Sequence, residues 1–132
     1  CDNAGASIYS LSSTVYTDTG GDVLRRLRRT PHLSNENKRL FFASFEVEAE
    51  RGVGLVSGQG SDPQLILRYS NDGGQTWGVE RTRSLGAMGE YSQRIRWDQC
   101  GSGRDRVWEV SISDPVKVCL FDAYVEVERG LA

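Results

Sequence analysis

The chain has 132 residues, a net charge of −2 and 26% charged residues, which is the size of one ordinary domain. The near-neutral balance excludes the strongly basic character of a polyanion-binding protein, although 14 of the 16 basic residues are arginine. Arginine is favoured where proteins meet carboxylates, so this bias indicates contacts with other proteins, or alternatively only the base composition of the genome.

The three cysteines, Cys1, Cys100 and Cys119, form neither an even set for disulfides nor a C-x-x-C metal spacing. We therefore expect a reducing compartment. No apolar run approaches the roughly 20 residues of a membrane span, which predicts a soluble protein without a membrane partner. The chain begins with Cys1 rather than Met, so we expect a fragment of a longer protein or a processed chain.

The first 21 residues are small and polar, and we expect them to form a connector or the remnant of an upstream domain, with short strands at 8–11 and 14–16. Residues 22–30 fit either a helix or a strand and end before Pro31. This segment contains four arginines that we predict to face a partner protein, with nucleic acid as a secondary possibility: Arg25, Arg26, Arg28 and Arg29.

Residues 39–51 alternate so regularly that only a strand explains them. One face would carry Phe41, Ala43, Phe45, Val47 and Ala49, and the other would carry Ser44, Glu46, Glu48 and Glu50. Four glycines and a proline make residues 52–63 a long loop.

Residues 70–77 contain the strongest turn chemistry of the chain, between two apolar runs, and predict a hairpin. Their pattern resembles the Asp-box of sialidases and other β-proteins, S-x-D-x-G-x-T-W, with Ser70, Asp72, Gly74, Thr76 and Trp77 at the defining positions. That resemblance implies a structural motif away from any catalytic site. We expect the strand to resume at Thr76 and the Trp77 indole to cover the core.

Three further strands are predicted at 91–97, 107–112 and 116–129. The apolar phase of the last one flips at Leu120 and Phe121, which indicates either a one-residue bulge or a bend between two sheets. About seven strands with almost no helical pattern predict an all-β, two-layer antiparallel β-sandwich of jelly-roll-like type over residues 22–132. Arg94 and Arg96 lie on the polar face of their strand, as candidate interface residues able to pair with the glutamates of 46–50.

The sequence predicts no catalytic residues, no metal ligands and no cofactor. His32 is the single histidine, so neither a Ser/His/Asp triad nor a histidine metal site is available. Asp72 lacks the spacing of a calcium loop and fits turn chemistry better. Carbohydrate binding for host recognition remains the alternative function, because tryptophan and tyrosine residues would form a stacking platform if they faced water: Trp77, Trp97, Trp108 and Tyr91.

Several short motifs follow one another as they do near the C-terminus of the packaged-DNA stabilisation proteins of short-tailed phages, and the resemblance runs from about residue 8 to residue 130. The motifs lie at 8–11, 29–33, 60–63, 67–77, 89–91, 94–97, 104–107 and 111–116. One departure is the polar corner at 99–101, where the family pattern would place an apolar residue.

This resemblance implies a non-enzymatic virion protein in which a β-propeller precedes a β-rich C-terminal region. Such a protein would assemble in the host cytoplasm as a homo-oligomeric ring in the neck or tail hub. It would seal the packaged DNA and contact the portal or adaptor and the tail needle or fibres. Residues 1–21 would then resemble the last strand of the propeller.

Overall fold

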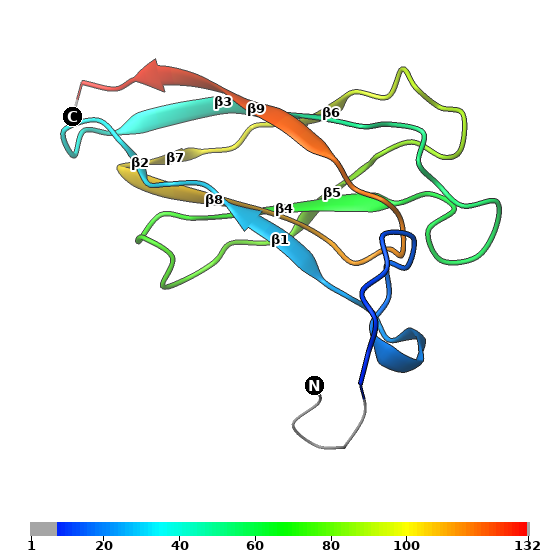
Figure 1. Cartoon of the computed structure of the whole chain (residues 1–132). Helices are drawn as coiled ribbons and strands as arrows, with labels where there is room; N and C mark the ends of the chain where they lie inside the picture. The colour runs from blue at the N-terminus through cyan, green and yellow to red at the C-terminus, as the bar shows by residue number, and fades with distance from the viewer. Residues whose placement is uncertain (1–7, 132) are drawn as a thin grey trace.

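A computed structural model describes residues 8–131 of the chain. In this part the chain forms nine strands and one short 3-10 helix, Thr19–Gly21, arranged as two facing antiparallel sheets (Figure 1). The strands are β1 (Arg26–Arg29), β2 (Leu33–Ser34), β3 (Leu40–Ala49), β4 (Gln64–Ser70), β5 (Arg81–Ser84), β6 (Ile95–Asp98), β7 (Ser102–Gly103), β8 (Asp105–Ile112) and β9 (Leu120–Arg129). The predicted β-sandwich is therefore confirmed.

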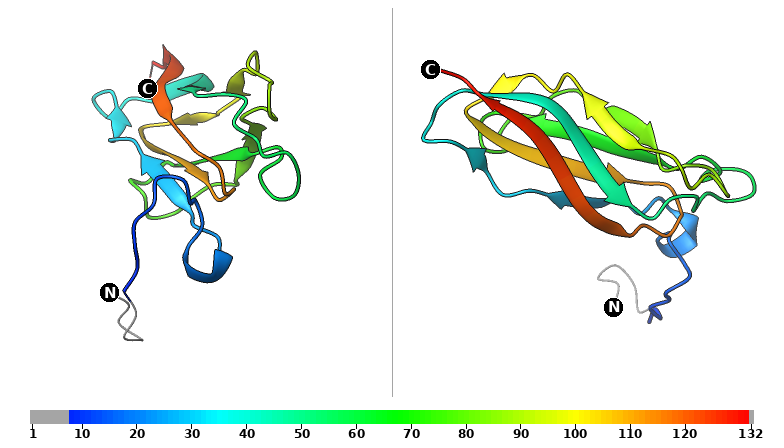
Figure 2. Two further views of the ribbon diagram at one scale, coloured as in Figure 1. Left: turned by 45° about the vertical axis from the view of Figure 1, so that its right-hand side comes forward. Right: turned by 90° about the horizontal axis from the view of Figure 1, so that it is seen from above.

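One sheet has the strand order β1-β8-β4-β5, with β2 beside one end of β8, and the other places β3 between β6 and β9, with β7 at one end. Figure 2 shows β9 running beside β3 along its length. The core between the sheets is aromatic: the Trp108 ring stacks on Phe45 at 4.6 Å and meets Tyr69 edge-on at 5.3 Å. Trp97 and Trp108 are completely buried, as are Leu67, Leu85 and Ile95.

Strand β3 confirms the long alternation but corrects its phase. The partners of Phe42 and Ser44 on β9 are the consecutive residues Val127 and Glu126, so Ala43 is an extra residue that forms a bulge. Before the bulge Leu40 and Phe42 face the core and Phe41 is exposed; after it Phe45, Val47 and Ala49 are buried. The prediction that Phe41 and Ala43 share the core face is wrong because a bulge reverses the side on which each following residue lies.

A second bulge lies on β9, where Glu48 and Ala49 of β3 pair with Asp122 and Leu120. Phe121 is the unpaired residue, so the phase flip in the sequence reflects the predicted bulge. This strand starts at Leu120 rather than at residue 116. The polar corner also has a simple explanation, because Cys100 is completely buried and takes the place of the apolar residue.

Other expectations at the chain level are corrected. The segment 22–30, which fitted either a helix or a strand, contains strand β1. No strand forms at 8–11 or 14–16; the nearest β pairing is an isolated bridge between Thr17 and Val23. The strand predicted at 91–97 is shorter, since β6 starts at Ile95 and Tyr91 is 70% exposed. The loop at 52–63 has no strand or helix, as predicted.

Candidate interaction surfaces

The outer face of the β1-β8-β4-β5 sheet carries a buried carboxylate surrounded by arginines. The side chain of Glu109, in the middle of β8, is only 1% exposed. Its oxygens accept hydrogen bonds from Arg29 Nε at 2.6 Å, Arg68 Nε at 2.6 Å and Arg25 Nη2 at 3.3 Å. These arginines come from β1, from β4 and from the residue before β1, so Glu109 ties the edge strand to the centre of the sheet.

Trp77 completes this group, which we call the Glu109 cluster (Arg25, Arg29, Arg68, Trp77 and Glu109). The Trp77 ring lies 4.9 Å from the guanidinium carbon of Arg29 and 4.8 Å from that of Arg68. The indole therefore covers the outer face of the sheet, and the prediction that it covers the core is wrong. Strand β5 starts at Arg81, so Thr76 and Trp77 belong to the loop.

Burial disfavours the charged form of Glu109, but hydrogen bonds from Arg68 and Arg29 outweigh this effect and lower the pKa of the carboxyl group below its ordinary value. The carboxylate is therefore ionised at neutral pH. Glu80 adds a second carboxylate 3.8 Å from Arg25. The patch retains an excess of positive charge and can attract an anionic partner surface.

The hairpin loop at 70–77 is closed by hydrogen bonds to one exposed aspartate. Asp72 accepts from the Ser70 hydroxyl at 2.5 Å, from the Thr76 hydroxyl and from the backbone N–H groups of Gln75 and Thr76. These bonds, the one from Ser70 first, lower the pKa of Asp72 well below its usual range. The Ser70 oxygen accepts from the N–H of Gly74 at 2.9 Å. The loop side chains are thus occupied in holding the turn.

Arg106 connects this hairpin to the core. Its side chain is completely buried, lies 4.0 Å from the centre of the Tyr69 ring, and donates to Asn71 Oδ1 at 2.9 Å and to the carbonyls of Cys100 and Ser102. Sequence reasoning missed both Arg106 and Glu109. For Arg106 the available signal was its place on the same face of β8 as Trp108 and Val110, where a buried charge demands partners. Glu109 lies on the opposite face of the strand, and alternation gave no sign of its burial.

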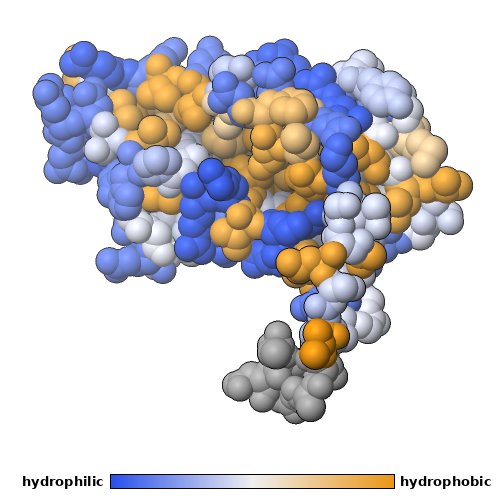
Figure 3. Space-filling view, viewed as in Figure 1, coloured by the Kyte–Doolittle hydropathy of each residue, from blue (hydrophilic) through white to orange (hydrophobic). Residues whose placement is uncertain are grey.

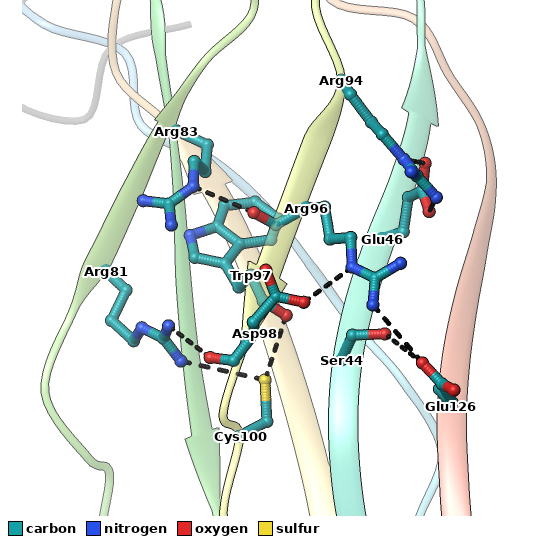
Figure 4. Close-up of polar contacts among 10 residues, drawn as sticks. All are labelled: Ser44, Glu46, Arg81, Arg83, Arg94, Arg96, Trp97, Asp98, Cys100 and Glu126. Carbon is teal, nitrogen blue, oxygen red and sulfur yellow. Dashed lines mark hydrogen bonds and ion pairs between the residues drawn. The ribbon is translucent and has the colours of Figure 1, made fainter.

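The second arginine group lies on the other sheet and is drawn in Figure 4. Arg94 forms a two-pronged pair with Glu46 at 2.7 and 2.8 Å, and its hydrogen bonds lower the pKa of Glu46. Arg96 bonds Asp98 at 2.7 Å and Glu126 at 3.4 Å. The predicted pairing of the arginine and glutamate faces is therefore present between Glu46 of β3 and Arg94, the residue before β6.

The structure does not gather the candidate interface arginines into one patch. Arg25 and Arg29 belong to the Glu109 cluster, whereas Arg94 and Arg96 lie on the opposite layer. Arg26 donates to the carbonyls of Asp114 and Val116 at 2.5 and 2.7 Å, which ties β1 to the loop before β9. Of the six, only Arg28 has a side chain that forms no hydrogen bond or ion pair with any residue that the structure describes.

The described residues show no group of three or more His, Cys, Asp or Glu side chains that would hold a metal ion. Within the same part of the chain no helix has the length and apolar character needed to cross a membrane. Of the aromatic residues proposed for carbohydrate stacking, Trp97 and Trp108 are completely buried, and the Trp77 ring packs against two guanidinium groups. Tyr91 is 70% exposed.

The two antiparallel layers, the core between them and the paired charges on their outer faces define an all-β sandwich domain. The family described as bacteriophage P22 Gp10, beta-sandwich, matches residues 25–128. This range begins one residue before β1 and ends one residue before the end of β9. The chain therefore belongs to this family and is a structural domain of a phage tail protein. No curated protein matches the chain.

Proposed function

We propose that this domain is part of a tail-hub protein that seals the packaged DNA and joins the neck of the virion to the tail needle or fibres. Residues 1–21 would be the connector to an upstream domain, and residues 22–132 the C-terminal sandwich. In the full-length protein, a closed ring of subunits would contact the portal or adaptor. The observation that carries this proposal is the family match, because it extends over both sheets.

The geometry supports a mechanical role. Sheets held by an aromatic core form a rigid body, and their charges are fixed by partners on neighbouring strands. Such fixed charges provide register and specificity when two proteins meet. Arg94 is a suitable contact residue, because its side chain is 64% exposed and Glu46 holds it in place. Nothing in the geometry favours the carbohydrate-binding alternative.

The experiment uses the full-length protein and DNA-filled heads that lack it. Arg94→Glu should impair attachment to the heads and leave their DNA accessible to nuclease, while the circular dichroism spectrum stays that of a β protein. The matched control is Arg104→Glu, because Arg104 is also exposed but lies in the turn before β8. Heads that retain DNA equally well with both variants would count against the contact role of this face.

A further inference from the structure

The two lateral sides of the sandwich differ. On one side β5 and β6 are joined by side chains that cross between the sheets: Arg81 donates to the Asp98 carbonyl at 2.6 Å and Arg83 to the Arg96 carbonyl at 2.9 Å (Figure 4). On the other side lie β1 and β9, which among residues 8–131 pair only with β8 and with β3, respectively. This second side is open, and we call it the β1/β9 edge.

Core side chains form the floor of the β1/β9 edge, although Phe45 and Val47 themselves are at most 2% exposed. Two adjoining hollows of about 170 and 510 Å³ lie there, and both are lined by Arg28, Val110 and Leu120. The larger hollow reaches Phe45 and Val47, which belong to the core. Figure 3 shows this side as an apolar, hollowed region bordered by polar groups. A sandwich that functions alone would cover these residues with a loop or a further strand.

The rims of the opening are also apolar. On β9 the exposed fractions are 39% for Leu120, 64% for Phe121, 54% for Tyr124 and 41% for Val127, and on β1 Leu27 is 49% exposed. A ten-residue edge strand with this surface is a site for pairing with another chain.

The two strands of this edge carry opposite charges. Three of the four residues of β1 are arginine, whereas β9 contains Asp122, Glu126 and Glu128 against Arg129. Arg28 and Asp122 line the same hollow, and neither forms an ion pair within residues 8–131. The edge thus has a basic strand in one layer and an acidic strand in the other, which a partner with the reverse order would match.

We propose that the β1/β9 edge binds the same edge of a second copy of this chain. A two-fold axis parallel to the strands places the β1 layer of one copy beside the β9 layer of the other. The basic β1 of each copy then faces the acidic β9 of its partner, so the dimer contains this contact twice. A two-fold axis perpendicular to the sheets would instead place β9 against β9, acid against acid. Because β1 and β9 run in the same direction in Figure 1, the facing strands would be parallel, and both layers would continue across the contact.

This contact would also cover the hollows, because Leu120 and Phe121, which line them, would be buried against the edge of the partner. The edge-to-edge contact uses the same surface on both copies, so it produces a dimer and no larger assembly. A ring needs a head-to-tail contact, which would be made elsewhere on the subunit. The inference therefore does not depend on the proposed sealing of DNA, and either can fail without the other.

The first test measures the mass of the 132-residue chain by sedimentation velocity over rising concentration. We expect a dimer that Phe121→Ser converts to a monomer, with an unchanged circular dichroism spectrum. Val79→Ser is the control, because Val79 is 84% exposed but lies in the loop before β5. A wild-type chain that stays monomeric up to about 1 mM, or one that grows beyond a dimer, would overturn the proposal.

The second test uses charge exchange, which separates the contact from folding. Arg28→Glu alone and Asp122→Lys alone should each weaken the dimer at least about tenfold, because like charges then face one another. An equimolar mixture of the two variants should restore it as a mixed dimer, and so should the double variant. Single variants that dimerise as the wild type does, or a mixture that stays monomeric, would refute the edge contact.

Discussion

Replacing Glu109 with Gln gives the most direct measure of what holds β1 to its sheet. The change keeps the shape of the side chain but removes the charge that three arginines share, two of them at 2.6 Å. Loss of one partner of a fully buried pair costs about 3–5 kcal/mol. Water reaches these arginines, whose side chains are 22% to 50% exposed, so we expect a smaller loss of about 2–3 kcal/mol.

Urea unfolding at neutral pH, followed by tryptophan fluorescence, measures this loss as a shift of the midpoint by about 1–2 M. Glu80→Gln is the matched control, because Glu80 is half exposed and lies 3.8 Å from Arg25; it should cost less than about 0.5 kcal/mol. The view of Glu109 as the anchor of β1 would be refuted if both variants unfolded at the wild-type midpoint.

The same variant gives a pH signature. The pKa of Glu109 is lowered in the folded protein, so the unfolded chain binds more protons as the pH falls below the ordinary carboxyl value of 4.5. The stability from this group is therefore complete above that pH and is lost as the pH falls through the folded pKa. The difference in unfolding free energy between wild type and Glu109→Gln should narrow as the pH falls below 4.5; a constant difference would contradict the assignment.

Three further predictions concern single contacts. Trp77→Ala should cost about 1–2 kcal/mol in urea unfolding, because two guanidinium groups lose the ring, while Tyr91→Ala should stay within about 0.5 kcal/mol; equal losses would contradict the stacking role. Arg106→Met should lower the free energy of unfolding by about 3 kcal/mol, since it leaves buried acceptors unpaired, and a neutral effect would contradict this. Arg94→Gln should raise the pKa of Glu46 toward 4.5 in an NMR titration, and an unchanged value would show that the pair does not form in solution.

Local patterns were sufficient for much of the fold. The alternation in β3, β8 and β9, the turn chemistry at 70–77 and the phase flip at Phe121 all depend on neighbours in the chain, and each was predicted from the residues alone. The bulge at Ala43 was missed because small and apolar residues occupy both faces there, so the sequence shows no change of phase.

Only the tertiary structure decided what covers each face. Period-two alternation separates the two sides of a strand, but it does not say whether the outer side meets water or other side chains. Glu109 and the Trp77 indole lie together because β8, β1, β4 and the 70–77 loop converge from distant parts of the chain. The open β1/β9 edge likewise results from which strands end each sheet, and strand order is a long-range property that no local pattern contains.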